Sequence, residues 1–517
     1  MTSEQRRLAT TVFVLSGITL LSRLLGFVRE QILASTLGAT YAADAFVAAQ
    51  LVPTALDAIV GTAMATALLP LLTAAKNRED NELARLYRAA TLALGAGYLA
   101  ETILLYWQAP AVMATLAPGL PDHARAQAVT LARILAPAPL LLGLASLHTM
   151  LLHTHSRFWI PAAAALGPNV AVVISCLVLR QGTTAHTIAW ALVAGYTAQV
   201  TLLVLAALRL RIPWRTDRPD WAAVSRAAAL ALPLMASSAL GQTTSFVDKF
   251  LASHMREGTI ASLNYALKLV QLPVGVIIQG LAQVMFARFA HFAAAGDRDT
   301  LTAELARTLR LLLFVFLPGV GLLVVLSEPA VATAFQRGRF DSQATQLTAQ
   351  AMTAYAPAVL PLSIVPLLTN VANALQLTKL PLLGTSVATV AYVTLAVTLA
   401  PFLAHRGLAL AWALAQMSAM LVLAWAVTRH LGPTPMRAAA AAVPPNLAAT
   451  AAASLAAWAT SRSVEAALVK LTLGALAGGG AWLLVHGLLR TPELSWGMAV
   501  VQGVLKRRPL YRHRPSV

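Results

Sequence analysis

Residues 9–28 read ATTVFVLSGITLLSRLLGFV, a run of twenty residues in which Arg23 carries the only charge. About 20 apolar residues in a helix are enough to cross the hydrocarbon core of a bilayer. A helix satisfies its own backbone hydrogen bonds in lipid, whereas an open strand does not. Because the run continues past any plausible cleavage site, we expect a first transmembrane helix here and no cleaved signal peptide.

The rest of the chain repeats this pattern. Of the 517 residues, 58% are hydrophobic and 11% are charged, and the mean hydropathy is +0.70. A soluble domain carries about 25% charged residues. The apolar segments long enough to span a membrane lie near 9–28, 43–72, 88–108, 127–153, 158–179, 186–208, 223–251, 259–287, 308–335, 345–375, 381–404, 407–428, 438–460 and 467–489. The sequence therefore predicts an all-α polytopic membrane protein with fourteen transmembrane helices.

The positions of the basic residues predict the orientation. Arg6 and Arg7 precede the first segment. Further clusters of basic residues, such as Arg209, Arg211 and Arg215, lie in every second loop, on the same side of the membrane as Arg6 and Arg7. Loops rich in Lys and Arg stay in the cytoplasm. We therefore expect a multi-pass protein of the bacterial inner (cytoplasmic) membrane with both termini cytoplasmic.

The net charge of +18 has the same explanation, because the basic residues lie in short loops between apolar runs. We therefore expect no nucleic-acid partner. Cys176 is the single cysteine, so no intrachain disulfide forms, and no metal-ligand spacing or GxxxxGK[ST] loop is present. We expect no cofactor and no metal site. The basic residues between Lys506 and Arg514 are expected to lie on anionic lipid headgroups or to anchor the topology.

An internal repeat predicts two related bundles. ILAS at 32–35 matches FLAS at 250–253, and LVP at 51–53 matches QLP at 271–273. Six segments separate the two copies, so both enter the membrane in the same direction, as in transporters built from parallel repeats. We expect two pseudo-symmetric lobes around a central cationic cavity. The predicted divisions are an N-terminal lobe at 1–215, a C-terminal lobe at 216–430, two additional spans at 431–490 and a basic cytoplasmic tail at 491–517.

Charged residues inside these segments are the candidate functional residues. A charge at the bilayer centre costs about 2.5–3.5 kcal/mol, so it normally faces a wet cavity or a partner. Arg23 and Arg29 lie about 9 Å apart along one helix, and their guanidinium groups suit phosphate oxygens. With Lys268 and Asp44 they form the predicted substrate-binding set.

A second set is predicted to serve coupling or gating: Glu30, Asp57, Asp248 and Asn373. Two alternatives remain open from the residues alone. Arg29 and Glu30 form an interfacial ion pair in one of them. In the other, Asp248 and Lys249 form a pair at the end of the span, and the long lysine side chain reaches the membrane surface.

Several motifs resemble the MurJ (MviN) family of lipid II flippases, which belongs to the multidrug/oligosaccharidyl-lipid/polysaccharide exporter superfamily. They are SRLLGFVRE at 22–30, ADAF at 43–46, YALKLVQLP at 265–273, FQRGRF at 335–340 and TKLP at 378–381. The resemblance covers essentially the whole chain. It implies that Arg23 and Arg29 engage the lipid pyrophosphate, and that Asp44 is the aspartate that opens the second helix.

The chain departs from the family's pattern at some of these positions. Lys268 stands where the family usually has arginine, and Glu30 replaces an aspartate. Asp57 stands where Gram-negative members often carry an arginine, and Leu267 replaces an acidic residue. Leu377 occupies the place of an aspartate, which weakens the expectation of a sodium site, although Asp248 and Asn373 remain candidates for it.

The expected function is transport, not enzymatic catalysis: alternating access that moves undecaprenyl-pyrophosphate-linked glycan, lipid II, from the cytoplasmic to the periplasmic leaflet. Membrane lipids and cell-wall synthases are the other expected partners, and coupling to a monovalent cation or to the membrane potential is a further expectation. The alternatives are a flippase for another polyprenyl-pyrophosphate-linked oligosaccharide, such as an O-antigen or exopolysaccharide unit, and a membrane-embedded polyprenyl-lipid transferase. A degenerate, non-transporting relative is a further alternative. A cationic-drug antiporter is disfavoured because a cavity built on Arg23, Arg29 and Lys268 repels cations.

Overall fold

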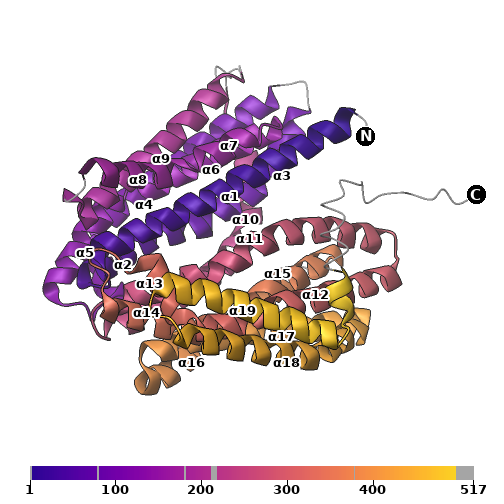
Figure 1. Cartoon of the computed structure of the whole chain (residues 1–517). Coiled ribbons are helices and arrows are strands. Elements are labelled where there is room, and N and C mark those ends of the chain that lie inside the picture. Colours follow the sequence, from indigo (N-terminus) through magenta and orange to yellow (C-terminus); the bar gives the residue numbers. More distant parts are fainter. Residues whose placement is uncertain (1–2, 78–80, 180–181, 211–217, 378, 497–517) are drawn as a thin grey trace, which may run out of the picture. The chain divides into compact units, whose positions relative to one another are not determined.

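The computed structural model describes residues 3–77, 81–179, 182–210, 218–377 and 379–496 (Figure 1). In these ranges the chain consists of helices joined by short loops and contains no strand. The helices are α1 (Ser3–Leu37), α2 (Tyr41–Leu56), η1 (Asp57–Gly61), α3 (Thr62–Lys76), α4 (Glu82–Leu116), α5 (Asp122–Leu135), α6 (Ala138–Thr154), α7 (Trp159–Ala164), α8 (Gly167–Leu179), α9 (Ala185–Leu208), α10 (Trp221–Ser253), α11 (Thr259–Ala294), α12 (Arg298–Val325), α13 (Ser327–Phe335), α14 (Ser342–Tyr355), η3 (Ala356–Ala358), α15 (Val359–Ala374), α16 (Lys379–Leu403), α17 (His405–Leu431), α18 (Thr434–Arg462) and α19 (Ala467–Leu488).

The predicted membrane spans correspond to these helices. Twelve helical stretches in the described part are long and apolar enough to cross a membrane, and the bent helix α11 makes a thirteenth. The remaining predicted segment, 9–28, lies inside α1, which runs as one unbroken helix of 35 residues (Figure 1). The prediction of an all-α, multi-pass membrane protein is confirmed.

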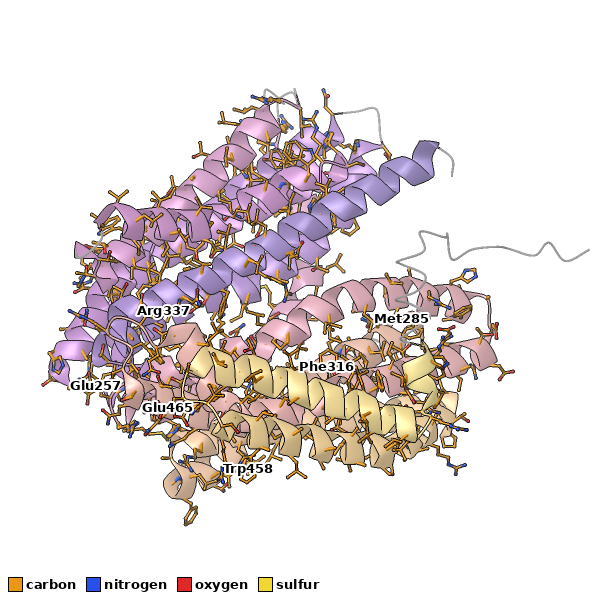
Figure 2. The ribbon with its side chains drawn as sticks, in the orientation of Figure 1. Glu257, Met285, Phe316, Arg337, Trp458 and Glu465 are labelled. Carbon is orange, nitrogen blue, oxygen red and sulfur yellow. The ribbon has the colours of Figure 1, made fainter. Side chains whose placement is uncertain are left out.

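Apolar side chains on the outside of the helices fit a lipid environment. Trp458, for example, is 47% exposed and projects from α18, whereas Phe316 of α12 is buried (Figure 2). Trp107, Leu177 and Phe402 are also largely exposed. A soluble monomer rarely leaves so much apolar surface in water, so these side chains are suited to hydrocarbon.

The chain forms two compact units. Unit 1 comprises 1–268, 334–348 and 389–411, and unit 2 comprises 269–333, 349–388 and 412–517. The two-lobe organisation therefore agrees with the prediction, while the predicted lobe boundaries at 215 and 430 stay a prediction. Helices α11, α13, α14, α16 and α17 each contribute residues to both units.

The core of unit 1 is built largely from small residues. Ala63, Ala67, Ala89 and Ala227 are buried with Tyr87 where α3, α4 and α10 pack together. Alanine lets helix backbones approach closely, which is how helices associate where no hydrophobic force acts between them.

Unit 2 shows the same principle in α12, α18 and α19. A Cβ atom at Gly478 of α19 would lie 3.0 Å from the backbone oxygen of Ala453 in α18. Gly474, one turn earlier, approaches Ala457 in the same way. These glycines therefore allow α19 to pack directly against α18.

Proline sets a local irregularity in α2. Pro53 has no N–H, and the regular helix ends at Leu56, where the π-helical segment η1 begins with Asp57. Such π segments are rare and often occur at functional sites. The irregularity places the carboxylate of Asp57 at its start, about one turn after Pro53.

Candidate functional site

Arg29 and Glu30, about two turns before the end of α1, form an ion pair inside unit 1. The Nη2 atom of Arg29 donates to Oε1 of Glu30 at 2.8 Å, and the two side chains are only 18% and 7% exposed. The Nε atom of Arg29 and the Oε2 atom of Glu30 are buried and have no partner in the described part of the chain. The pair therefore leaves a donor of Arg29 available for a further oxygen ligand.

Arg23 lies nearly two turns earlier on the same helix. Its side chain is partly exposed and makes no hydrogen bond or ion pair with any described residue. A guanidinium group has five N–H donors and no acceptor. Arg23 thus offers a full set of donors to an anion, at a different depth from Arg29.

Arg29 also faces polar groups from two other helices. Tyr196 of α9 lies within electrostatic reach of Arg29 and of Asp57, and close to Gln50 of α2. Residues predicted for substrate binding and for coupling therefore lie in one polar region of unit 1. Tyr196 and Gln50 were not found by sequence reasoning because neither carries a charge in its apolar segment.

Lys268, in α11, has an exposed side chain with no hydrogen-bond partner among the described residues. One turn earlier, Tyr265 is buried against Phe335 and Phe340. This aromatic packing fixes that part of α11 within unit 1. The predicted role of Lys268 in substrate binding stays a prediction.

Asp44 is buried, with 2% of its surface exposed. Its carboxylate accepts hydrogen bonds from the backbone N–H groups of Gly258 at 2.8 Å and Ala261 at 2.7 Å. These N–H groups lie at the start of α11, where the helix itself provides no carbonyl group to accept their hydrogen bonds. Asp44 therefore holds the beginning of α11, and its predicted contact with substrate stays a prediction.

Three loops of unit 1 meet beside Asp44, and we call them the loop cluster: 38–40, 254–258 and 336–341. Gly38, Gly258 and Gly338 all have positive φ, of 67°, 77° and 60°. A Cβ on Gly258 would collide with the backbone oxygen of Ala39, and one on Gly338 with that of Ser35. Glu257 (labelled in Figure 2) accepts a hydrogen bond from the N–H of Tyr41 at 2.9 Å. The loop cluster therefore depends on glycine for its close backbone packing.

Asp248 and Lys249, at the end of α10, are bonded to each other at 2.7 Å. The hydroxyl of Tyr392 in α16 also donates to Asp248 at 2.9 Å. Both charged side chains are largely buried, at 11% and 13% exposed. Asn373, the fourth residue of the predicted coupling set, is exposed at the end of α15 in unit 2. The coupling role of both residues stays a prediction.

Asp57 lies beside an acidic residue that sequence reasoning missed. Glu101 of α4 and Asp57 act on each other electrostatically, and both act on Tyr98. The available signal was an acidic residue inside the apolar segment 88–108. The described residues contain no group of three or more His, Cys, Asp or Glu side chains able to hold a metal ion.

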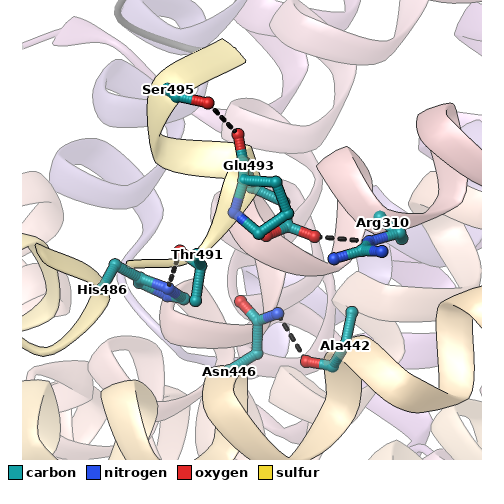
Figure 3. A network of polar contacts seen from close by, with 8 residues as sticks. Arg310, Ala442, Asn446, His486, Thr491, Glu493 and Ser495 are labelled. Atoms are coloured by element: carbon teal, nitrogen blue, oxygen red, sulfur yellow. Dashed lines mark hydrogen bonds and ion pairs between the residues drawn. The ribbon is translucent and has the colours of Figure 1, made fainter. Parts of the chain in front are cut away.

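Unit 2 contains a separate polar network (Figure 3). Arg310 of α12 donates to Glu493 at 2.5 Å, and His486 of α19 contacts the hydroxyl of Thr491 at 2.9 Å. Trp496 lies under the guanidinium of Arg310. Residues 491–496 of the predicted tail are therefore packed on unit 2, whereas Lys506 to Arg514 lie outside the described residues.

Comparisons with known proteins agree with these features. The sequence profile described as lipid II flippase MurJ matches residues 33–476. A probable lipid II flippase MurJ of Rhizobium meliloti (strain 1021) is 29% identical over 434 residues, which is 80% of each chain. A lipid II flippase MurJ of Burkholderia cenocepacia is 26% identical over 360 residues, covering 66% of this chain and 69% of the relative.

Solved structures show the same fold. A lipid II flippase MurJ in an inward closed conformation has a TM-score of 0.79 at 20% identity, covering 93% of this chain and 100% of the other. An inward-facing multidrug resistance MATE family transporter of the MOP superfamily has a TM-score of 0.67 at 14% identity, covering 80% and 96%. The expectation of a transporter, not an enzyme, is confirmed by these relatives. With its profile match spanning most of the sequence, the chain belongs to the MurJ family of lipid II flippases.

Proposed function

We propose that this protein moves lipid II, the lipid-linked peptidoglycan precursor, from the cytoplasmic to the periplasmic leaflet of the inner membrane. The observation that carries the proposal is the pair of arginines on α1. Arg23 has no partner among the described residues, and Arg29 keeps a buried, unpaired Nε donor. Arginine forks match the paired oxygens of phosphate groups.

The mechanism we propose is alternating access. The anionic headgroup binds at Arg23 and Arg29, with Lys268 as a third cation, while the polyprenyl tail stays in the bilayer. A pyrophosphate compensates the positive charge that these residues bring into the membrane, which makes a filled site more favourable than an empty one. Release to the other leaflet then exposes the headgroup to the cell-wall synthases that use it.

The proposed orientation places both termini in the cytoplasm. It is supported by the basic residues that recur in alternate loops. The transport cycle is driven in this proposal by a monovalent cation or by the membrane potential. Glu30, Asp57 and Asp248 are the acidic residues of the predicted coupling set, and all three lie in unit 1.

A second cargo is favoured by a specific observation. Lys268, Asp57 and Leu377 each depart from residues that MurJ-like sequences usually carry. A lysine lacks the bidentate fork of arginine and acts as a point charge. A related polyprenyl-pyrophosphate-linked oligosaccharide, such as an O-antigen unit, is therefore the alternative cargo.

Depletion and rescue distinguishes the two cargoes. The gene is expressed in cells stripped of their own lipid II flippase and, separately, in cells lacking an O-unit flippase. We expect the gene to restore growth of the cells that lack a lipid II flippase. We expect it not to restore surface O-antigen in the cells that lack an O-unit flippase. The reverse pattern, with the protein present in the membrane, would reject lipid II as the cargo.

A further inference from the structure

Two acidic side chains lie near the middle of neighbouring, oppositely directed spans. Asp57 is close to the centre of the 36-residue span Tyr41–Lys76, and Glu101 is close to the centre of the 35-residue span Glu82–Leu116. Both therefore lie at similar depth in the membrane. Acidic residues at this depth are rare and usually functional.

The local backbone is shaped to accept these groups. A Cβ on Gly61, at the end of η1, would collide with Oδ1 of Asp57 and would lie 3.4 Å from the hydroxyl of Tyr98. A Cβ on Gly143 of α6 would collide with the ring of Tyr98. Two glycines thus make the space in which the Asp57 carboxylate and the Tyr98 hydroxyl converge.

The oxygen atoms in this space are not satisfied. Oδ1 of Asp57 and Oε2 of Glu101 are inaccessible to solvent and have no hydrogen-bond partner in the described part of the chain. Tyr98 is 2% exposed, and its hydroxyl likewise bonds to no described residue. Unpaired polar atoms in a buried site are costly, and each calls for a ligand.

No cationic side chain in the described part of the chain forms an ion pair with Asp57 or Glu101. The titratable groups that act on them are Tyr98 and, from α9, Tyr196. Four charged or titratable residues of the other elements packed on η1 have partners elsewhere. Asp44 of α2 bonds to Gly258, Lys76 of α3 to the Thr154 oxygen, His148 of α6 to the Leu144 oxygen, and Asp248 of α10 to Lys249.

We propose that Asp57 and Glu101 hold a single exchangeable proton between them, with the Tyr98 hydroxyl as the third oxygen of the site. Two carboxylates whose charges act on each other in a poorly solvated place are not both ionised easily, so a proton on one of them is favoured. A proton satisfies this site with two carboxyl groups, whereas the described residues supply no third acidic or histidine ligand for a metal ion.

The site is linked to the substrate arginines through Tyr196, which lies within electrostatic reach of both Arg29 and Asp57. An anionic headgroup at Arg29 adds negative charge near the acidic pair. Binding of the anion and retention of the proton therefore favour each other, and the effect is reciprocal. This link rests on the proposed function, whereas the proton site itself does not.

Infrared difference spectroscopy of the purified full-length protein tests the site without transport. Between neutral and alkaline pH, where exposed carboxyl groups stay ionised, the carbonyl stretch of a protonated carboxyl group is expected in the wild type, and lost in Asp57→Asn and in Glu101→Gln. Asp122→Asn, whose side chain is fully exposed, is the control and should keep the band. A band unchanged in both variants, or absent from the wild type, would overturn the proposal.

Two further arms test position and ion identity. Gly61→Ala retains both acids but displaces the Asp57 carboxylate, so the band should shift or disappear; Gly95→Ala of α4, which meets open space, should leave it unchanged. Equal spectra for Gly61→Ala and the wild type would contradict the site. The same spectra are recorded at constant pH with choline or Na⁺ as the cation of the buffer. The band should be present with both, and loss of the band in Na⁺ would assign the site to a metal cation instead. None of these readouts depends on which lipid is carried.

Discussion

The carboxylate of Asp44 accepts a hydrogen bond from the backbone N–H of Gly258, a residue 214 positions further along the chain. A second bond from Ala261 completes the cap of α11. The first acidic residue of the second span thus fixes the start of a helix in the internal repeat. Within unit 1, this one side chain ties the second span to the beginning of α11.

Asp44→Ala is therefore expected to destabilise the protein. It leaves two buried N–H groups without acceptors, and each costs about 1–3 kcal/mol. Asp44→Asn keeps one acceptor and should lose less. Thermal unfolding in detergent measures both, with the exposed Asp122→Asn as the control. An Asp44→Ala protein as stable as the wild type would refute the capping role.

Gly258→Ala and Gly296→Ala form a matched pair. Both glycines have positive φ, of 77° and 72°, but only a Cβ at Gly258 meets backbone, at Ala39. The left-handed conformation alone costs an L-residue about 1–2 kcal/mol. Gly296→Ala should show only that cost, whereas Gly258→Ala should also reduce the yield of folded protein. Similar unfolding temperatures for the two variants would contradict the close packing of the loop cluster.

Glu493 is expected to hold the segment 491–496 on unit 2. It is 2% exposed and pairs with Arg310, so Glu493→Ala leaves a largely buried arginine without its partner. Removing one member of a fully buried ion pair lowers the free energy of unfolding by about 3–5 kcal/mol. Because Arg310 is 27% exposed, the loss for Glu493→Ala should be smaller than that. Thermal unfolding and limited proteolysis after α19 would both report the loss.

The pair of Arg288 and Glu304 supplies the comparison for this prediction. Its atoms are 2.7 Å apart, but Arg288 is 43% exposed. Exposed pairs contribute about 0–1 kcal/mol. Glu304→Ala should therefore change stability little. If Glu304→Ala and Glu493→Ala behave alike, the segment 491–496 is not held by its buried ion pair.

The spans could be predicted from sequence because each is a local property. A run of about 20 apolar residues predicts a helix wherever it occurs. The ion pair of Arg29 and Glu30 was likewise open to prediction because the two residues are adjacent. The break after Leu56 is only partly predictable: a proline inside a helix, here Pro53, favours a kink, but it does not indicate that a π-helical turn follows.

Long-range partners could not be predicted in this way. The sequence identified Asp44 as important, but its acceptor role depends on N–H groups 214 and 217 residues away. Glu101 was missed because its significance comes from Asp57 on another span. Tyr392, which bonds Asp248, is similarly distant in sequence. Such contacts follow from helix packing and not from local pattern.

The central claim is that Arg23 and Arg29 carry the headgroup of lipid II across the membrane. The most direct measurement is the amount of lipid II accessible at the outer surface of cells depleted of their own flippase and expressing this protein. The wild type and Arg157→Ala, a change at an exposed loop arginine, are expected to restore outward lipid II. Arg23→Ala and Arg29→Ala are expected to reduce it to the level of depleted cells while still inserting in the membrane. Lipid II that remains inaccessible with the wild type present, or that is exported equally well by both arginine variants, would contradict the account.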